Sequence, residues 1–341
     1  MCFKLLNVVV IIILLGITSL SQAKESNNPD RIFNNNSACN RPSAKTADKC
    51  TGKFRDEPFI NLGQRLVPYK MNYAIYQFTK TDESALEVQY SLKYNFIKEF
   101  DEKCNQAHNF FFSYTGMFDF YVGTRSSGPV INRISNPAFH YKFDLVNSEN
   151  SSIWFDFGLE HKSNGQVTDP NDKDDNPNSP TYGQYITQLE YNKGNRHYFD
   201  GISVGSNYVS LSAGANKDNN NLTYGLTYKL YVTSESDVTW GKYAGSGVKL
   251  NDFDMINVNM SKTFMFNSVN FKDATLTLAY AIGKKGLSTD SVDIFAILPL
   301  YIDSCEWKFP FMVKAHFGPM DRMSDYTKSL SSIGIGFALS Y

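Results

Sequence analysis

The sequence lacks the features that identify several common protein classes. It has no strong charge imbalance, with 33 Lys and Arg against 34 Asp and Glu and a formal net charge of −1. A nucleic-acid-binding domain usually carries a basic patch, so we expect no nucleic-acid partner. After the N-terminus there is no unbroken apolar run long enough for a transmembrane helix. Any membrane-spanning segments would therefore have to be strands.

The longest apolar run lies at the N-terminus, in MCFKLLNVVVIIILLGITSLSQA. One lysine precedes an apolar stretch from Leu5 to Leu15, and small residues follow up to Ala23. This pattern is typical of a cleaved secretory signal, so we predict that residues 1–23 are removed and the protein is exported. Residues 24–66 are rich in Asn, Asp, Lys and Ser without periodicity, and we predict a polar extension outside the main fold.

Cysteine is scarce, and the predicted mature chain keeps four: Cys39, Cys50, Cys104 and Cys305. In an exported protein they allow two disulfides with three possible connectivities. Cys39 and Cys50 lie close together in the polar extension, so we favour that pair. No histidine cluster accompanies them, which argues against a zinc site.

Aromatic residues are abundant, at 15% of the chain, and apolar side chains alternate with polar ones along it. Period-2 alternation predicts strands, because successive side chains point to opposite faces. We count twelve such runs, at about 69–79, 84–98, 108–122, 137–147, 152–163, 206–216, 221–233, 252–266, 271–283, 290–302, 306–318 and 331–341.

Alternation alone also fits a secreted soluble β-protein. These runs, however, are mostly longer than the ~5–6 residues of a typical soluble strand. Short connections such as VNSEN and NKDNNN alternate with longer ones, and the chain closes on the aromatic-tipped strand SIGIGFALSY. We therefore predict that residues 67–341 form an all-β, twelve-stranded antiparallel transmembrane β-barrel.

The run 152–163 ends unusually. Its apolar parity, which includes Phe157 and Leu159, continues into His161 and Ser163. Side chains at i and i+2 of a strand stand side by side, so the imidazole could act as base for the hydroxyl. On this spacing alone, the favoured interpretation is a strand that has emerged into water and opens a polar loop.

The segment EHKSNG resembles the His-x-Ser-Asn-Gly signature of bacterial outer-membrane phospholipase A, a twelve-stranded barrel. Further similar segments follow in the expected order and run in patches from about residue 68 to 341: PYKMNYAIY, FSYTGMFDFYV, SSGP and GIGFALSY.

The resemblance implies that Ser163 is the nucleophile, that His161 is its general base, and that an Asn on the next strand orients the imidazole. One alignment places Gly183 at the Asn position, and the other places Asn207 there. Val209, Leu211 and Ala213 share the parity of Asn207, so the apolar face continues from it and parity favours Asn207. The long polar connection 164–206 that results departs from the family, and additional structure within it is expected between residues 182 and 191.

The resemblance also implies Ca²⁺ as cofactor. By carry-over, the Gly165 amide belongs to the oxyanion site, while Gln166 (through its carbonyl) and Ser203 are metal ligands. A further hydroxyl would come from a partner subunit, at Ser126 or Ser127. The connection also carries four clustered acidic residues, Asp169, Asp172, Asp174 and Asp175, which lack the spacing of an EF-hand loop, so we interpret them as solvated.

Together these features predict a calcium-dependent phospholipase of the bacterial outer membrane, active as a homodimer on phospholipids. Gly116 stands where the family pattern has an interface glutamine, so the details of the interface are expected to differ. A porin-like channel without enzymatic activity and a secreted soluble β-protein are the alternatives.

Overall fold

The structure, a computed structural model, describes residues 65–79, 83–101, 106–121, 125, 130–148, 151–217, 221–234, 238–266, 273–302 and 307–340. These fall within one compact unit, Cys50–Tyr341. The predicted signal and nearly all of the polar extension lie outside the described residues, as do the four cysteines.

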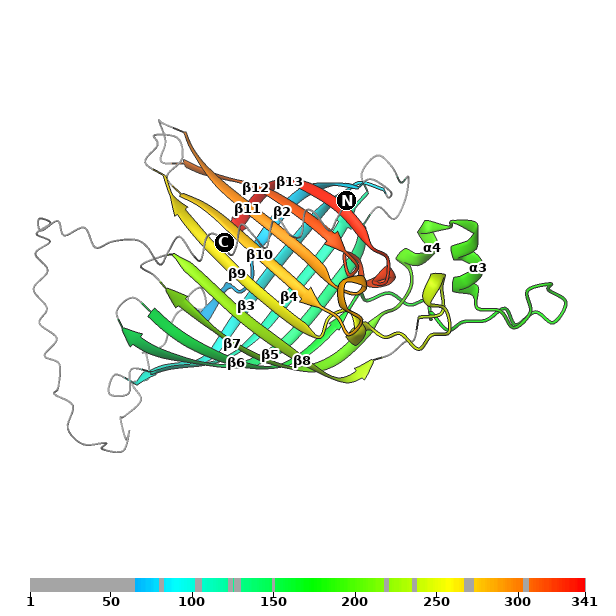
Figure 1. The fold of residues 1–341 in the computed structure, drawn as a ribbon, viewed down its shortest axis with the longest axis horizontal. Coiled ribbons are helices and arrows are strands. Elements are labelled where there is room, and N and C mark those ends of the chain that lie inside the picture. Colours follow the sequence, from blue (N-terminus) through cyan, green and yellow to red (C-terminus); the bar gives the residue numbers. More distant parts are fainter. Residues whose placement is uncertain are drawn as a thin grey trace, which may run out of the picture. The chain divides into compact units, whose positions relative to one another are not determined.

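Twelve antiparallel strands, β2 to β13, form a closed barrel (Figure 1). Neighbours in sequence pair with one another, and β13 closes the ring by pairing with β2. The fold class predicted from alternation is therefore confirmed. The strands are β2 Asn72–Thr79, β3 Ala85–Asp101, β4 Gln106–Phe120, β5 Val130–Ser148, β6 Ser151–Ser163, β7 Gly205–Lys217, β8 Leu222–Ser234, β9 Ile256–Met265, β10 Asp273–Ile282, β11 Ser291–Ile302, β12 Trp307–Gly318 and β13 Leu330–Ser340.

A short additional strand, β1 (Leu66–Pro68), pairs with β3 at Leu92–Tyr94, beyond the residues of β3 that pair with β2. β1 and β2 therefore lie end to end along one edge of β3, as a single barrel strand with a break between them. The predicted strand 69–79 covers the second of these pieces.

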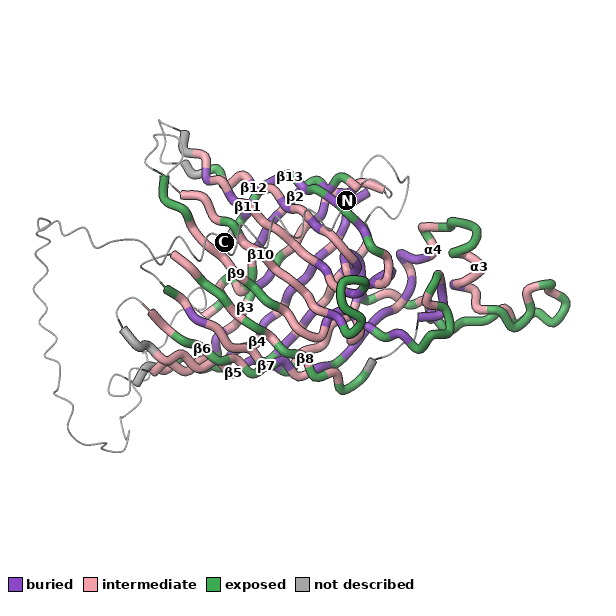
Figure 2. The backbone as a smooth tube through the Cα atoms, in the orientation of Figure 1, coloured by how far each residue is buried: buried purple, intermediate pink, exposed green. Residues whose placement is uncertain are grey.

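The two faces of the barrel wall differ as the alternation predicts. Large apolar side chains point outward and are exposed, such as Leu159 (52%), Leu226 (51%) and Ile333 (53%). Buried residues alternate with exposed ones most regularly along β13, and Figure 2 colours each residue of the wall by its burial. Because strand side chains alternate between faces, one surface meets an apolar environment while the other encloses polar groups.

The barrel interior is crossed by ion pairs. Arg133 Nη1 contacts an Asp119 oxygen at 3.1 Å, and its Nη2 contacts Asp321 at the same distance. Lys314 Nζ lies 2.7 Å from Glu87, which also pairs with Arg133. Each charge in this interior network has an opposite partner, which offsets the cost of removing it from water.

One end of the barrel carries the longer connections. That between β6 and β7 contains two short helices, α3 (Ile186–Lys193) and α4 (Arg196–Asp200). Three further connections at this end contain 3₁₀ turns: η2 (Gly241–Tyr243) and η3 (Leu250–Asp252) between β8 and β9, η4 (Gly286–Ser288) between β10 and β11, and η5 (Met323–Asp325) between β12 and β13. Several of these segments share one buried apolar cluster, which fixes them to each other: Phe199, Ile202, Val204, Val238, Trp240, Val248, Leu250, Phe253, Met323 and Tyr326.

Candidate active site

The end of β6 carries polar side chains on the outside of the barrel. Phe155, Phe157 and Leu159 are exposed, and alternation places His161 and Ser163 on the same outer face. Their strand neighbours point inward, where Glu160 accepts a hydrogen bond from Tyr208 at 2.9 Å. An imidazole and a hydroxyl thus extend the lipid-facing surface at the end with the longer loops.

His161 lies directly opposite Asn207 on the adjacent strand β7. The distance from His161 Nδ1 to Asn207 Oδ1 is 2.9 Å. Because the amide oxygen is an acceptor, this contact holds the ring in the tautomer that carries its proton on Nδ1. Nε2 then has a lone pair with which it can accept a proton.

A second contact fixes the Asn207 amide itself. Asn207 Nδ2 donates to Thr233 Oγ1 on β8 at 2.8 Å, and the backbone N–H of Asn207 contacts the same oxygen at 3.3 Å. Thr233 thereby determines which end of the amide faces His161. The three side chains form a chain of hydrogen bonds across β6, β7 and β8.

Ser163 pairs with Gly205 on β7, two positions beyond the His161–Asn207 pair. As an i, i+2 neighbour, its backbone lies roughly 6.5–7 Å from that of His161. Within the described residues, no hydrogen bond joins the two side chains. Catalytic hydrogen bonds are often long in the absence of substrate, so this spacing is compatible with a nucleophile and its base.

Asn164 fastens the start of the long connection to its end. This side chain is 1% exposed, and its Nδ2 donates to the Ile202 carbonyl at 2.6 Å. Its Oδ1 accepts the backbone N–H of Val204 at 3.0 Å. The asparagine of the His-x-Ser-Asn-Gly sequence, next to Ser163, thus has a structural role: it joins the two ends of the long connection.

The hydrogen bonds of Asn164 bring two of the predicted calcium-binding segments together. Thr168 and Ile202 form a parallel bridge, and the Ser203 N–H donates to the Thr168 carbonyl at 2.8 Å. The segment carrying Gly165 and Gln166 therefore runs beside Ser203. Gly165 has φ 63°, a left-handed conformation that favours glycine. Ser126 and Ser127 lie outside the described residues.

Two of the four clustered acidic residues of the connection, Asp169 and Asp174, form local hydrogen bonds. Asp169 Oδ1 accepts the backbone N–H of Asn171 at 2.8 Å, and Asp174 accepts the Thr181 hydroxyl at 2.5 Å. Hydrogen bonds from Ser179 and Thr181 lower the pKa of Asp174. In the part of the chain that is described, no group of three or more His, Cys, Asp or Glu side chains is arranged to hold a metal ion.

Beneath the site, on the inner face, Lys162 is held by Asp254, whose carboxylate lies 3.1 Å from Lys162 Nζ and 2.6 Å from Lys229 Nζ. Burial would raise the pKa of Asp254, but the ammonium groups of Lys229 and Lys162 outweigh it and keep the pKa below its ordinary value. This cluster therefore stabilises the fold near neutral pH, and its contribution is lost when strong acid protonates Asp254.

Sequence reasoning named His161, Ser163 and Asn207, and the structure brings them to one outer surface. Gly183, the rejected alternative, lies away from them in the long connection with φ 75°. Thr233 was missed because a bulge shifts the register: Asn207 pairs with Thr233, but Tyr208 pairs with Tyr231. The additional residue, Val232, reverses the parity of β8, so alternation alone would place Thr233 inside.

The fold that carries these residues was compared with known proteins. No protein-family model matches the chain, and no curated protein matches its sequence. Outer membrane phospholipase A from Escherichia coli has a similar structure, with a TM-score of 0.53 over 82% of this chain and 96% of that one. The fold is that of outer-membrane phospholipase A.

A second phospholipase A structure, from Salmonella typhi, gives a TM-score of 0.52 over 83% of this chain and 93% of its own. It is described as a dimer with bound calcium. The sequence identities are only 14% and 13%, so the likeness to both phospholipase A structures establishes the fold. Separately, none of the described helices is long and apolar enough to cross a membrane.

Proposed function

We propose that the protein is a calcium-dependent phospholipase of the outer membrane that hydrolyses acyl esters of glycerophospholipids. One observation carries the proposal: the 2.9 Å contact between His161 Nδ1 and Asn207 Oδ1 on the lipid-facing surface. Polar side chains on a lipid-facing surface are energetically unfavourable, so their presence there favours a functional role. Ser163 lies two residues further along β6, on the same outer face as His161.

The reaction follows from these positions. Ser163 Oγ attacks the ester carbonyl carbon while His161 Nε2 takes its proton. The tetrahedral intermediate then expels the lysophospholipid oxygen, which receives the proton from His161, and an acyl-serine remains. Water, activated by the same imidazole, hydrolyses the acyl-serine and releases the fatty acid. Asn207 keeps Nδ1 protonated and the ring oriented throughout, and in this proposal the Gly165 N–H donates to the developing oxyanion.

The outer surface below the site suits a lipid substrate. An exterior groove of 580 Å³ is lined by aromatic and aliphatic residues of β4 to β8, including Phe155, Phe157 and Leu211. Phe157 is six residues from Ser163 along β6, about 20 Å at the rise of a strand. An acyl chain whose ester lies at Ser163 would reach this groove with its tail.

Ca²⁺ fits the chemistry of the available donors. The Ser203 hydroxyl and the Gln166 carbonyl are the oxygen ligands that a hard cation prefers. When bound there, the ion would supply positive charge beside the oxyanion. Because this donor set is neutral and small, we include a second copy of the chain in the proposal, contributing Ser126 or Ser127. The active form would then be a homodimer.

A porin-like channel is the weaker candidate. A wide aqueous channel would expose the side chains that line it. Here Glu87 is 0% exposed and Arg133 is 3% exposed, because the interior network excludes water from both.

The test is fatty-acid release from phospholipid by the purified protein in detergent, with Ca²⁺ and with a chelator. Ser163→Ala should reduce release by about 10³-fold or more, because the nucleophile is removed. Ser331→Ala is the matched control, an exposed serine at the start of β13, and should leave the rate unchanged. Equal release by the Ser163→Ala protein would exclude Ser163 as the nucleophile, and release that survives chelation would exclude the calcium requirement.

A further inference from the structure

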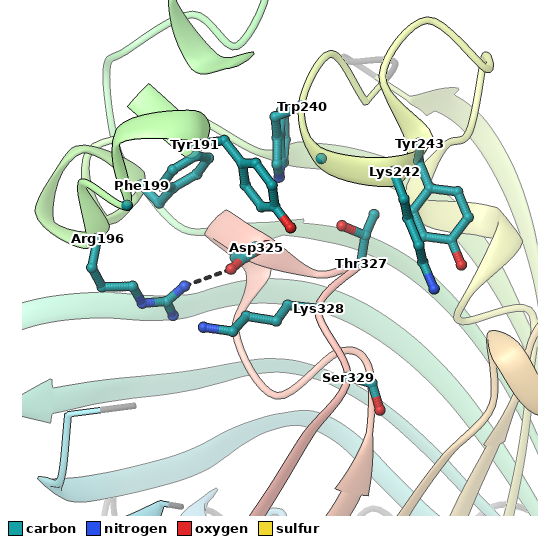
Figure 3. A pocket seen from close by; sticks show the side chains of 12 residues that line it. Tyr191, Arg196, Phe199, Trp240, Lys242, Tyr243, Asp325, Thr327, Lys328 and Ser329 are labelled. Carbon is teal, nitrogen blue, oxygen red and sulfur yellow. Dashed lines mark hydrogen bonds and ion pairs between the residues drawn. The ribbon is translucent and has the colours of Figure 1, made fainter. Parts of the chain in front are cut away.

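A second cavity lies at the loop end of the barrel, apart from the residues proposed for hydrolysis. It encloses 360 Å³ and is lined by three connections. The β6–β7 connection contributes Tyr191 and Arg196, and the β8–β9 connection contributes Trp240 and Tyr243. The β12–β13 connection contributes Asp325 and residues 327–329 (Figure 3). Nothing in the proposed hydrolysis uses this cavity.

The walls of the cavity are fixed rather than formed by loosely placed side chains. Phe199 and Trp240 belong to the buried apolar cluster, with ring centroids 5.9 Å apart, and Trp240 also contacts Tyr326 edge to face. Across the cavity, Arg196 Nη1 lies 2.5 Å from Asp325 Oδ2, which ties the helical connection to the β12–β13 connection. A ligand would thus meet a surface that is already organised.

A buried donor faces this cavity. Trp240 is 1% exposed, and its Nε1 has no hydrogen-bond partner among the described residues. In Figure 3 the nitrogen end of the indole points toward the space between Tyr191 and Thr327. Buried N–H groups are nearly always paired, so an acceptor is missing here.

The charge and shape of the lining define the ligand. Arg196 is paired with Asp325, and Lys242 adds a further positive charge at the border of the cavity. Lys242 Nζ lies 4.8 Å from the centroid of the Tyr243 ring. Excess positive charge selects an anion, and Lys and Arg are the usual phosphate-binding residues.

Aromatic rings and hydroxyl groups in the lining further restrict the kind of ligand that would bind. Tyr191 and Tyr243 offer flat apolar surfaces, while Thr327 and Ser329 offer hydroxyls that both donate and accept hydrogen bonds. A simple phosphate ion would use the cations but not the rings. A ligand that uses all of these groups has an apolar ring face, several hydroxyls and a negative charge.

The geometry points to a binding site for a phosphorylated saccharide, either free or as the headgroup of a glycolipid. Trp240 Nε1 donates to the sugar, the tyrosine rings pack on its faces, and Lys242 contacts the phosphate. The site is separate from Ser163, so binding does not depend on the proposed hydrolysis and can be measured on the Ser163→Ala protein.

The test is isothermal titration calorimetry on the full barrel. Detergent-solubilised protein is titrated with glucose 6-phosphate, glucose and inorganic phosphate, and binding of a glycolipid with a phosphorylated hexose headgroup is measured with protein in nanodiscs. We expect saturable binding of the phosphorylated sugar, about tenfold or more tighter than glucose or phosphate alone, since both parts contribute. Binding only of the glycolipid would identify the headgroup as the ligand, and binding of glucose 6-phosphate would identify the free form.

Three variants locate the site. Trp240→Phe keeps a ring but removes the N–H, and Lys242→Gln removes one charge. Each should weaken binding about fivefold, the usual effect of losing one hydrogen bond or one exposed charge contact. Lys173→Gln removes an exposed lysine of the long connection outside the cavity and should have no effect. Circular dichroism verifies that each variant is folded. No saturable binding of either form, equal affinity for phosphate and sugar phosphate, or unchanged affinity in both cavity variants would overturn the proposal.

Discussion

Polar side chains on the two faces of the barrel wall are organised in opposite ways. Inside, Glu87, Asp119 and Asp321 are ionisable groups paired with Arg133 and Lys314 and almost completely buried. Outside, His161, Asn207 and Thr233 form a chain of hydrogen bonds without a carboxylate. The interior groups satisfy one another and stabilise the fold, whereas the exterior chain leaves His161 Nε2 and Ser163 available for chemistry.

Breaking the interior network should give the largest change in stability. Arg133→Met removes the cation that contacts three carboxylates and leaves them short of positive charge in a buried site. Loss of one partner of a buried ion pair costs about 3–5 kcal/mol. We expect the free energy of unfolding, measured by urea titration in detergent, to fall by that amount.

Asn207→Ala should act on the rate and leave the fold intact. Without Asn207 Oδ1, neither the tautomer nor the orientation of His161 is fixed, and a misplaced catalytic group costs about 10²-fold. The measurement is kcat for fatty-acid release alongside the unfolding midpoint. A large loss of stability without a change in kcat would assign Asn207 to the interior class of polar residue instead.

Thr233→Val should have a smaller effect in the same direction. It removes the acceptor for Asn207 Nδ2 while preserving the β-branched shape, and a neutral hydrogen bond contributes about 1 kcal/mol, or roughly fivefold. We expect kcat to fall by about that factor. Thr227→Val, which removes a hydroxyl of the same strand that contacts Ser212 inside the barrel, is the comparison and should leave kcat unchanged.

The smallest effect should come from Lys142→Met. Its ion pair with Asp144 spans 2.9 Å, but the two side chains are 28% and 22% exposed. Partly solvated pairs contribute below about 1 kcal/mol. A loss of stability as large as that of Arg133→Met would mean that burial does not decide how much an ion pair in this barrel contributes.

Much of the scaffold could be predicted from the sequence because a strand has a fixed period. Alternation located all twelve barrel strands, and for β6 the predicted 152–163 differs from Ser151–Ser163 by one residue. The same parity argument placed Asn207 on the outer face beside His161. Both inferences depend only on the period-2 alternation of neighbouring residues, which can be read directly from the sequence.

Three features could not be predicted because they depend on irregular or distant structure. The bulge at Val232 reverses parity and hides Thr233. Additional structure was expected between residues 182 and 191, but its helical form was not, because α3 (ITQLEYNK) has little apolar periodicity and Tyr185 makes no side-chain cap bond. The contact between Arg133 and Asp321 joins residues 188 positions apart, so barrel closure alone brings them together.

The central claim is that an exterior serine is activated by a histidine on the same strand. It is tested most directly by treating the purified protein with an alkyl fluorophosphonate, which forms a stable adduct with activated serines, and locating the adduct by peptide mass spectrometry. We predict one adduct, on Ser163, that is lost in His161→Ala. An adduct on a different serine, or equal labelling of Ser163 without His161, would contradict the account.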